Sequence, residues 1–174
     1  MSLSWRTAIG VATAAALLVG SVVLSATAYA GTRPLAPVSQ EAPLAAKCQK
    51  QSFLAGHRYS AIQIARVAKR AGFRGQGWVI SVAVSLAESG GWTRARHINI
   101  DCSVDRGLWQ INSRWHHEVS DRQAFKPRGA ARAAHRISVG GSDWRQWTTY
   151  QSGAYRAYMA EAQAAVRELS PSGP

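Results

Sequence analysis

Acidic residues are scarce in this sequence of 174 residues, which has nine Asp and Glu against 21 Lys and Arg and a formal net charge of +12. This balance predicts an acidic partner and is compatible with a nucleic acid, an anionic membrane or an anionic polymer such as a cell wall. The sequence has no internal repeat and no nucleic-acid-binding motif, so no nucleic acid is expected as a partner.

Cysteine is equally scarce, with Cys48 and Cys102 as the only two. In a cytosolic protein such a pair would be free thiols, whereas in an exported protein it is more often a disulfide. A candidate set of metal ligands is the segment His116-His117-Glu118, but no further His or Cys lies at ligand spacing from it. We interpret it as a surface turn and expect no metal and no cofactor.

Residues 1–30 have the pattern of a secretory signal peptide. Arg6 precedes an apolar run over 8–24, and Ala28-Tyr29-Ala30 gives the small-x-small pattern that signal peptidase requires. The alternative is a retained membrane anchor, because no charge lies between Arg6 and Arg33. We predict cleavage after Ala30 and a secreted protein without stable membrane insertion. The disulfide between Cys48 and Cys102 is then expected as well.

The rest of the chain has the length of one domain. Residues 31–46 contain three prolines and few large apolar side chains, which predicts a flexible linker. Seven Trp, five Tyr and three Phe indicate a packed core or an aromatic-lined cleft. We therefore expect a folded domain over 47–170 that is monomeric, followed by a tail at 171–174.

Apolar periodicity predicts a mainly α fold in which helices surround a central buried helix. That central helix is expected at 78–87, where the side chains are apolar nearly all round. Its frequent β-branched residues would also suit a buried strand, but Ala83, Leu86, Ala87 and the stop at Gly90-Gly91 favour a helix. The segment between 92 and 113 is polar and irregular and is expected to contain a short β-hairpin flanking a cleft. Trp144, Trp147 and Tyr150 recur at three-residue spacing and are expected on one face of a helical turn. Further helices are predicted at 60–71 and from after Pro127 through 137, the latter ending at Gly140-Gly141. A last helix is predicted at about 154–169, and its apolar stripe consists of Tyr155, Tyr158, Met159, Ala162 and Val166.

Two carboxyl groups have environments that differ sharply. Glu88 ends the apolar segment, where desolvation and the negative end of the helix dipole are expected to raise its pKa, as a general acid requires. Asp105 follows in a polar segment beside Arg106 and is expected to remain ionised. Two carboxyl groups in such contrasting environments are typical of glycoside cleavage.

The residues around Asp105 add a family resemblance. Residues 105–115, DRGLWQINSRW, resemble the D-x-G-[IL]-x-Q-I-N-S-R-W strand motif of chicken-type lysozymes, and Glu88-Ser89 falls where that family has its acid. The same residues resemble the E-S and G-L-M-Q-I signature of soluble lytic transglycosylases, with Trp109 in the Met place. Both families belong to one lysozyme-like superfamily. Residues 144–150, WRQWTTY, resemble its later W-x-x-W element, so the resemblance covers about 79–155.

The resemblance implies an α+β lysozyme-like fold and a wall-cleaving enzyme, with peptidoglycan as the partner. It is implied to cut the β-1,4 bond between N-acetylmuramic acid and N-acetylglucosamine, with Glu88 as proton donor and Asp105 stabilising or trapping the sugar cation. Attraction of the basic chain to anionic wall polymers then gives a cell-wall-associated location. The implied substrate-binding residues are Ser89, Gln110, Asn112, Trp115, which stacks on a sugar, Trp147, which desolvates Glu88, and Tyr150.

Departures from both families leave the reaction open. Chicken-type lysozymes have four disulfides, whereas this chain has only two cysteines. His116 stands where those lysozymes have a second cleft Trp. Lytic transglycosylases lack an acid at the position of Asp105 and use one Glu, with a sugar hydroxyl replacing water. Hydrolase and transglycosylase therefore both remain, beside a non-catalytic glycan-binding module and a cationic membrane-disrupting protein.

Overall fold

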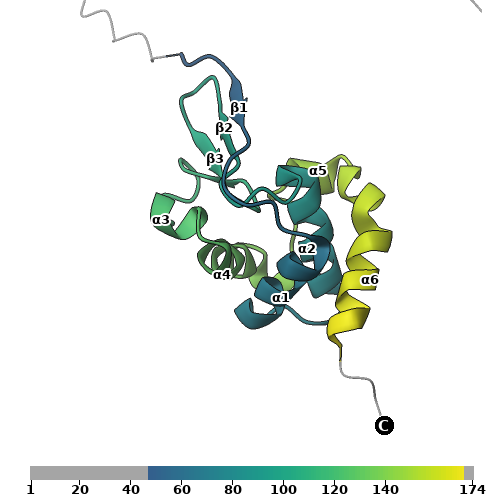
Figure 1. Cartoon of the computed structure of the whole chain (residues 1–174). Coiled ribbons are helices and arrows are strands. Elements are labelled where there is room, and N and C mark those ends of the chain that lie inside the picture. Colours follow the sequence, from purple (N-terminus) through teal and green to yellow (C-terminus); the bar gives the residue numbers. More distant parts are fainter. Residues whose placement is uncertain (1–46, 171–174) are drawn as a thin grey trace, which may run out of the picture. The chain divides into compact units, whose positions relative to one another are not determined.

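The computed structural model describes residues 47–170, so the predicted signal peptide, linker and tail lie outside the described residues. In chain order the elements are β1 (Gln51–Phe53), α1 (Ala61–Ala71), α2 (Gly75–Ser89), β2 (Arg96–Ile98), β3 (Val104–Arg106), β4 (Ile111–Asn112), α3 (Asp121–Ala124), α4 (Pro127–Ile137), the 3-10 turn η1 (Val139–Gly141), α5 (Thr148–Gln151), the 3-10 segment η2 (Ala154–Tyr158) and α6 (Met159–Leu169). Figure 1 shows the helices grouped on one side and the strands on the other. The mainly α fold with a small sheet confirms the predicted fold class.

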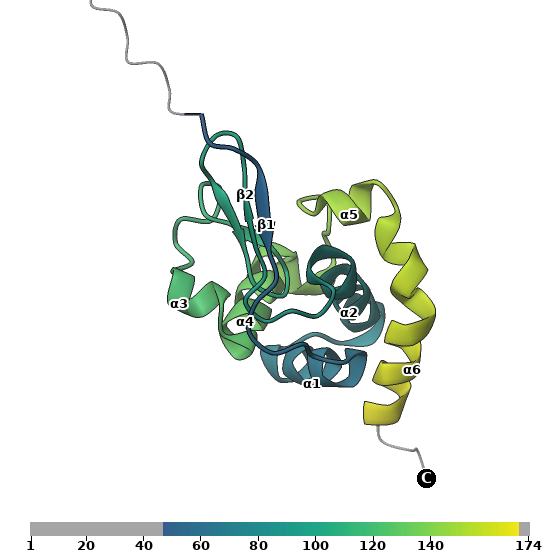
Figure 2. The same ribbon diagram turned by 45° about the horizontal axis from the view of Figure 1, so that its top comes forward.

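Helix α2 is the central helix that the sequence predicts. It contacts α1, α5 and α6 (Figure 2), and its buried residues include Trp78, Val82 and Leu86. It begins at Gly75 rather than at 78. The position of Gly77 has no room for a side chain, because a Cβ there would lie 2.7 Å from the carbonyl oxygen of Gly141.

Local signals mark both ends of α1 and the start of α4. Ser60 caps α1 with a reciprocal capping box to Gln63, and Gly72 ends α1 with a φ of 114°. Pro127 stands at the first turn of α4, where its missing N–H has no cost. Helix α4 stops at Ile137, and the separate turn η1 leads to Gly141, so the predicted helix end at Gly140-Gly141 was too late.

Two expectations for the C-terminal region were wrong in part. Trp144 and Trp147 pack together with ring centroids 4.9 Å apart, but they precede α5, and Tyr150 instead stacks on Tyr155 at 4.7 Å. The predicted helix over 154–169 begins as the 3-10 segment η2, and only α6 is α-helical. Of its predicted stripe, Ala162 and Val166 are buried, whereas the tyrosines and Met159 are partly buried against the core.

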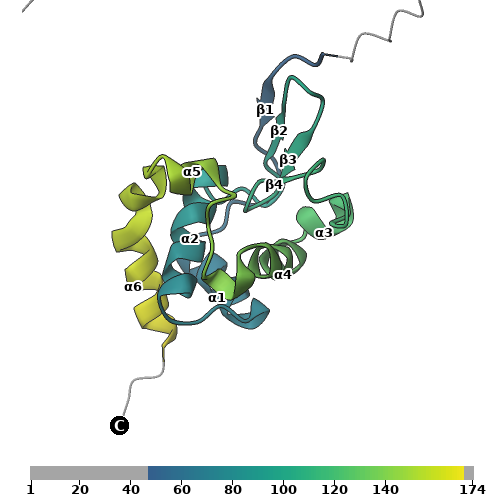
Figure 3. The ribbon, with the colours of Figure 1, turned by 180° about the vertical axis from the view of Figure 1, so that it is seen from behind.

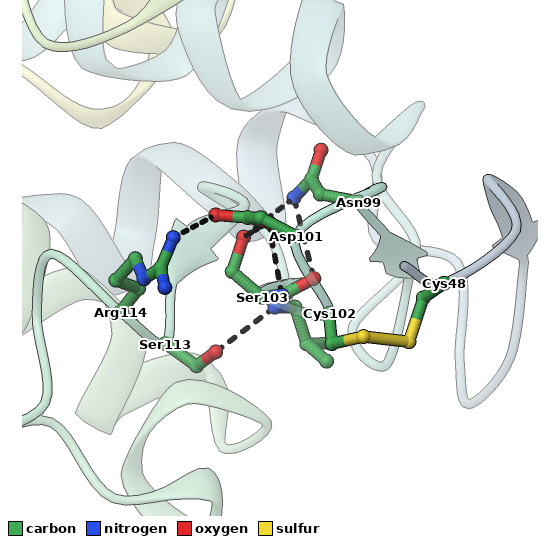
Figure 4. The surroundings of a disulfide bond; sticks show 8 residues. Cys48, Asn99, Asp101, Cys102, Ser103, Ser113 and Arg114 are labelled. Carbon is green, nitrogen blue, oxygen red and sulfur yellow. Dashed lines mark hydrogen bonds and ion pairs between the residues drawn. A yellow bond between two sulfur atoms is a disulfide. The ribbon is translucent and has the colours of Figure 1, made fainter. Parts of the chain in front are cut away.

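The strands form an antiparallel sheet in the order β1-β2-β3-β4 (Figure 3). The predicted hairpin corresponds to β2 and β3, and the prediction missed the two flanking strands. Strand β1 gives no alternating pattern because all three of its residues are exposed. The predicted disulfide between Cys48 and Cys102 is present and joins the chain just before β1 to the loop between β2 and β3 (Figure 4). The backbone N–H of Cys48 also donates to the carbonyl oxygen of Ile100 at 2.9 Å.

Candidate active site

The segment that follows β3 is fastened to the central helix. Trp109 is fully buried, and its Nε1 donates to the carbonyl oxygen of Ser81 at 3.0 Å, while Ser85 Oγ donates to that of Leu108 at 3.1 Å. Trp147, the residue before α5, also donates from its indole Nε1 to the carbonyl oxygen of Trp109 at 2.8 Å. These bonds fix Asp105, three residues before Leu108, relative to the last turn of α2, which carries Glu88.

Gly107 allows this segment to approach α3. Its φ is +71°, and a Cβ there would lie 2.0 Å from the carbonyl oxygen of Ala124. An L side chain would therefore be strained by the backbone and excluded by contact. The glycine of the DRG sequence is thus required by packing between β3 and α3.

Glu88 and Asp105 face a common groove. One part has a volume of about 580 Å³ and extends to Trp115, His116 and Trp147. A second part of about 340 Å³ extends over Ser52, Phe53 and His97. Both parts are lined by Glu88, Asn99, Asp105, Gln110 and Thr148, so the two carboxyl groups lie where the parts meet.

Glu88 is partly buried at the end of α2, and its Oε1 accepts a hydrogen bond from Thr149 Oγ1 at 2.7 Å. Burial raises the pKa of Glu88 above its usual value, hydrogen bonds from the side chain and backbone of Thr149 oppose that rise, and the negative charge of Asp105 adds to it. The direction and the main cause agree with the sequence prediction. A carboxyl group in this state can hold a proton at higher pH than an exposed glutamate.

Asp105 is held at both carboxylate oxygens. Asn112 Nδ2 donates to Oδ1 at 2.7 Å, and Asn99 Nδ2 donates to Oδ2 at 3.0 Å. Both amides also donate to Ser103 Oγ, at 3.0 and 3.2 Å. The carboxylate is thereby oriented by groups on β4 and on the loop between β2 and β3.

That loop is itself closed by several bonds (Figure 4). Asp101 accepts from the backbone N–H of Ser103 at 3.0 Å and from its hydroxyl at 2.7 Å, and it forms an ion pair with Arg114 at 2.8 Å. The disulfide joins Cys102 of the same loop to Cys48. The amide of Asn99 therefore belongs to a loop with covalent, ionic and hydrogen-bonded supports.

Asn112 and Gln110 line the groove with their side chains already engaged. Asn112 Oδ1 accepts from the backbone N–H groups of Arg114 and Trp115 at 2.9 and 3.2 Å. Its polar atoms thus serve mainly to shape the loop and to orient Asp105. Gln110 donates from Nε2 to the carbonyl oxygens of two residues, Ala95 and Gly107, which leaves Oε1 available as an acceptor.

The remaining predicted site residues divide into two groups. Trp115, which is 75 % exposed, and Trp147, which is buried, both line the groove. Ser89 does not, because its hydroxyl is buried, donates to the carbonyl oxygen of Ser85 and accepts from the N–H of Gly91. Tyr150 is also outside the groove lining, since it stacks on Tyr155. A role of Ser89 and Tyr150 in substrate binding therefore stays a prediction, and neither residue lines the two groove parts.

Sequence reasoning missed three residues that shape the site: Asn99, Thr149 and Arg106. Arg106 is only 3 % exposed, and its guanidinium binds Asp121 at 2.7 Å and the carbonyl oxygens of Ile111 and Val119 at 3.1 and 2.9 Å. It holds the loop that carries Trp115. Arg106 and Thr149 lie inside the resembling segments 105–115 and 144–150, whereas Asn99 lies in neither of them.

Within residues 47–170, no group of three His, Cys, Asp or Glu side chains is placed to hold a metal ion. His116 Nδ1 instead lies 3.5 Å from Glu118 Oε1. None of the helices in this described part is long and apolar enough to cross a bilayer.

Residues 65–149 match a protein-family model described as a lysozyme-like domain. This match confirms the resemblance to the lysozyme-like superfamily and associates the domain, in general terms, with activity on peptidoglycan-related glycans. The matched range begins in α1 and ends at Thr149, and so includes both carboxyl groups of the groove. The comparison with curated proteins found no match.

Proposed function

We propose that this protein is a secreted glycosidase that hydrolyses the β-1,4 bond between N-acetylmuramic acid and N-acetylglucosamine in peptidoglycan. The observation that carries the proposal is the pair Glu88 and Asp105 at the meeting point of the two groove parts, with the pKa of Glu88 raised by burial. The family match over residues 65–149 supports a peptidoglycan-related glycan as the class of substrate.

Glu88 acts as the general acid. In its protonated form it donates a proton to the glycosidic oxygen as the bond from that oxygen to the anomeric carbon breaks. The leaving sugar departs with a free hydroxyl. Glu88 is left as a carboxylate, and it then accepts a proton from the water that adds to the anomeric carbon.

Asp105 stabilises the positive charge that develops on the sugar ring. Its two amide donors, Asn99 and Asn112, hold the carboxylate in one orientation, so little reorganisation is needed as that charge forms. Trp115 offers an exposed aromatic face at one part of the groove, and we assign it to stacking on a sugar ring.

Asp105 also favours hydrolysis over lytic transglycosylation. A transglycosylase of this superfamily, as the resemblance implies, needs no second acid, because a hydroxyl of the sugar itself attacks the anomeric carbon. Retaining and orienting a second carboxylate is useful when the sugar cation must persist until water arrives. Mass analysis of fragments released from purified wall decides: hydrolysis adds one water, whereas an anhydro-sugar end would assign the protein to the transglycosylases.

Glu88→Gln tests the catalytic assignment. The variant retains the shape of the side chain and the hydrogen bond from Thr149, but it has no proton of suitable acidity to donate. We expect clearing of cell-wall suspensions to fall at least about 100-fold with the thermal unfolding midpoint little changed. Clearing at the full rate would refute the role of Glu88 and would favour a membrane-disrupting protein.

The wild-type protein and the Glu88→Gln variant also distinguish the proposed enzyme from a non-catalytic glycan-binding module. If the wild-type protein sediments with purified wall but releases no fragments, it binds without cutting. If the wild type releases fragments and the Glu88→Gln variant sediments without releasing them, the protein is an enzyme whose binding and chemistry are separable.

A further inference from the structure

Helix α4 carries a row of exposed arginines that the proposed reaction does not use. Arg128, Arg132 and Arg136 are spaced four residues apart, so they lie on one face of the helix. The row is about 12 Å long, since each residue of an α-helix rises about 1.5 Å. We call these three residues the α4 arginine row.

The opposite face of α4 is apolar and is buried against the rest of the domain. Its buried residues are Gly129, Ala130, Ala131, Ala133 and Ala134, and the helix packs on α1 and α3. The small side chains bring the helix close to the core, and the arginines project from the outer side. The helix is therefore anchored by one face and presents a cationic surface on the other.

The charge of the row is not neutralised by acids. Helix α4 itself contains no Asp or Glu. In the part of the chain that the structure describes, the arginines that form ion pairs are Arg106, Arg114 and Arg145. The neighbouring helix α1 also lacks acids and exposes Arg66 and Arg70, so the cationic surface has no acidic border on that side.

We propose that the α4 arginine row binds a phosphodiester polymer of the cell wall along the helix. Guanidinium groups match the geometry of phosphate oxygens, and three in a line suit a chain that carries a charge at each repeat. Ile137, the last residue of α4, lines the groove, so a polymer bound on the row lies beside one end of the substrate groove. The inference rests on the proposed location at the wall but not on the catalytic roles of Glu88 and Asp105.

Two other polyanions fit the surface less well. A membrane-binding helix needs an exposed apolar face to enter the headgroup region, and the apolar face of α4 is buried in the core. Single-stranded nucleic acid is usually bound by aromatic side chains interleaved with basic ones, and the sequence of α4 contains no aromatic residue apart from His135, whose ring packs on Phe73.

The test compares two triple variants of equal charge in the full chain. In the first, Arg128, Arg132 and Arg136 are changed to Gln. In the matched control, the exposed residues Lys47, Arg156 and Arg167 are changed to Gln. Binding to purified poly(glycerol phosphate) is measured by titration at several salt concentrations, and thermal unfolding confirms that both variants are folded.

We expect the row variant to bind poly(glycerol phosphate) at least about tenfold more weakly, with the slope of log K against log salt reduced by about 2, since each lost contact removes about 0.7. The control variant is expected to change the affinity less than about threefold. Equal weakening in both variants would overturn the proposal, because binding would then follow net charge alone. Unchanged binding in the row variant would overturn it as well.

Two further probes decide the class of polymer. Duplex DNA and vesicles of anionic phospholipid are titrated with the same three proteins, and a larger effect of the row variant on either than on poly(glycerol phosphate) would contradict the proposal. These readouts need no catalysis, so the inference can fail while the proposed glycosidase activity stands. Conversely, a wild-type protein that binds the polymer through the row but releases no wall fragments would leave the inference standing and reject the glycosidase.

Discussion

Removal of the disulfide is expected to destabilise the domain by an amount that its position in the chain predicts. Cys48 and Cys102 are 54 residues apart, and for a closed loop of that length the chain-entropy relation gives about 4 kcal/mol. In the double variant Cys48→Ser, Cys102→Ser, the free energy of unfolding should fall by that amount. For a domain of this size the midpoint of thermal unfolding should fall by roughly 15 °C.

The assay is equilibrium unfolding in urea, with the slope m as an internal check. An unchanged m with a lower midpoint would show that the folded and unfolded states expose similar surfaces to those of the wild type. Wild-type protein treated with a thiol reductant should unfold at the same urea concentration as the double variant. The double variant itself should not respond to the reductant.

The same change should also affect activity, because the disulfide supports the loop that carries Asn99 and Ser103 (Figure 4). At a temperature where the variant is fully folded, we expect the wall-cleaving rate to fall. A loss of stability below about 1 kcal/mol would refute the entropic reasoning. It would mean that the reduced, unfolded chain retains structure that already limits its freedom.

Two further predictions concern single side chains. In the wild type the hydroxyl of Thr149 donates to Glu88 and lowers the pKa of Glu88, so the change Thr149→Val should raise that pKa further and move the alkaline limb of the rate-against-pH profile to higher pH. The variant Thr149→Ser retains the hydroxyl and should show the wild-type profile. An alkaline limb that stays in place in the Val variant would contradict the role of Thr149. Ser81 Oγ is buried and is the one buried side-chain polar atom without a hydrogen-bond partner within the described residues. Ser81→Ala should therefore stabilise the domain by about 1 kcal/mol in urea unfolding, and a destabilised variant would indicate that the hydroxyl has a partner in solution.

Local signals in the sequence were sufficient for the helical part of the fold. Ser60 and Gly72 mark the two ends of α1, and the apolar segment before Glu88 identifies the central helix because few surface helices are apolar all round. The exact start of α2 was not predictable in this way. Helix α2 begins at Gly75 after Arg74, whose side chain makes no capping hydrogen bond, so no local capping signal marks this start.

The candidate site was predictable where a residue type itself carries the chemistry. Glu88 and Asp105 were identified by their environments and by the resembling motif, and the structure places both in the groove. Asn99 and Thr149 were not identified, because an isolated Asn or Thr has no distinctive pattern and their contacts depend on strand register and on α5. Ser89 was assigned to substrate binding from the resembling Glu-Ser pair, and in the structure its hydroxyl is buried and bonded to the backbone of Ser85 and Gly91.

The position of the disulfide has a mechanical consequence. Cys48 is the second described residue, and its sulfur is bonded to the same loop that orients Asp105. Tension applied from the N-terminal side of the domain would enter that loop through a covalent bond and would reach the carboxylate before it reached the helices. In a domain tethered by that end, force would therefore act on the groove around Asp105 before it acted on the helical core.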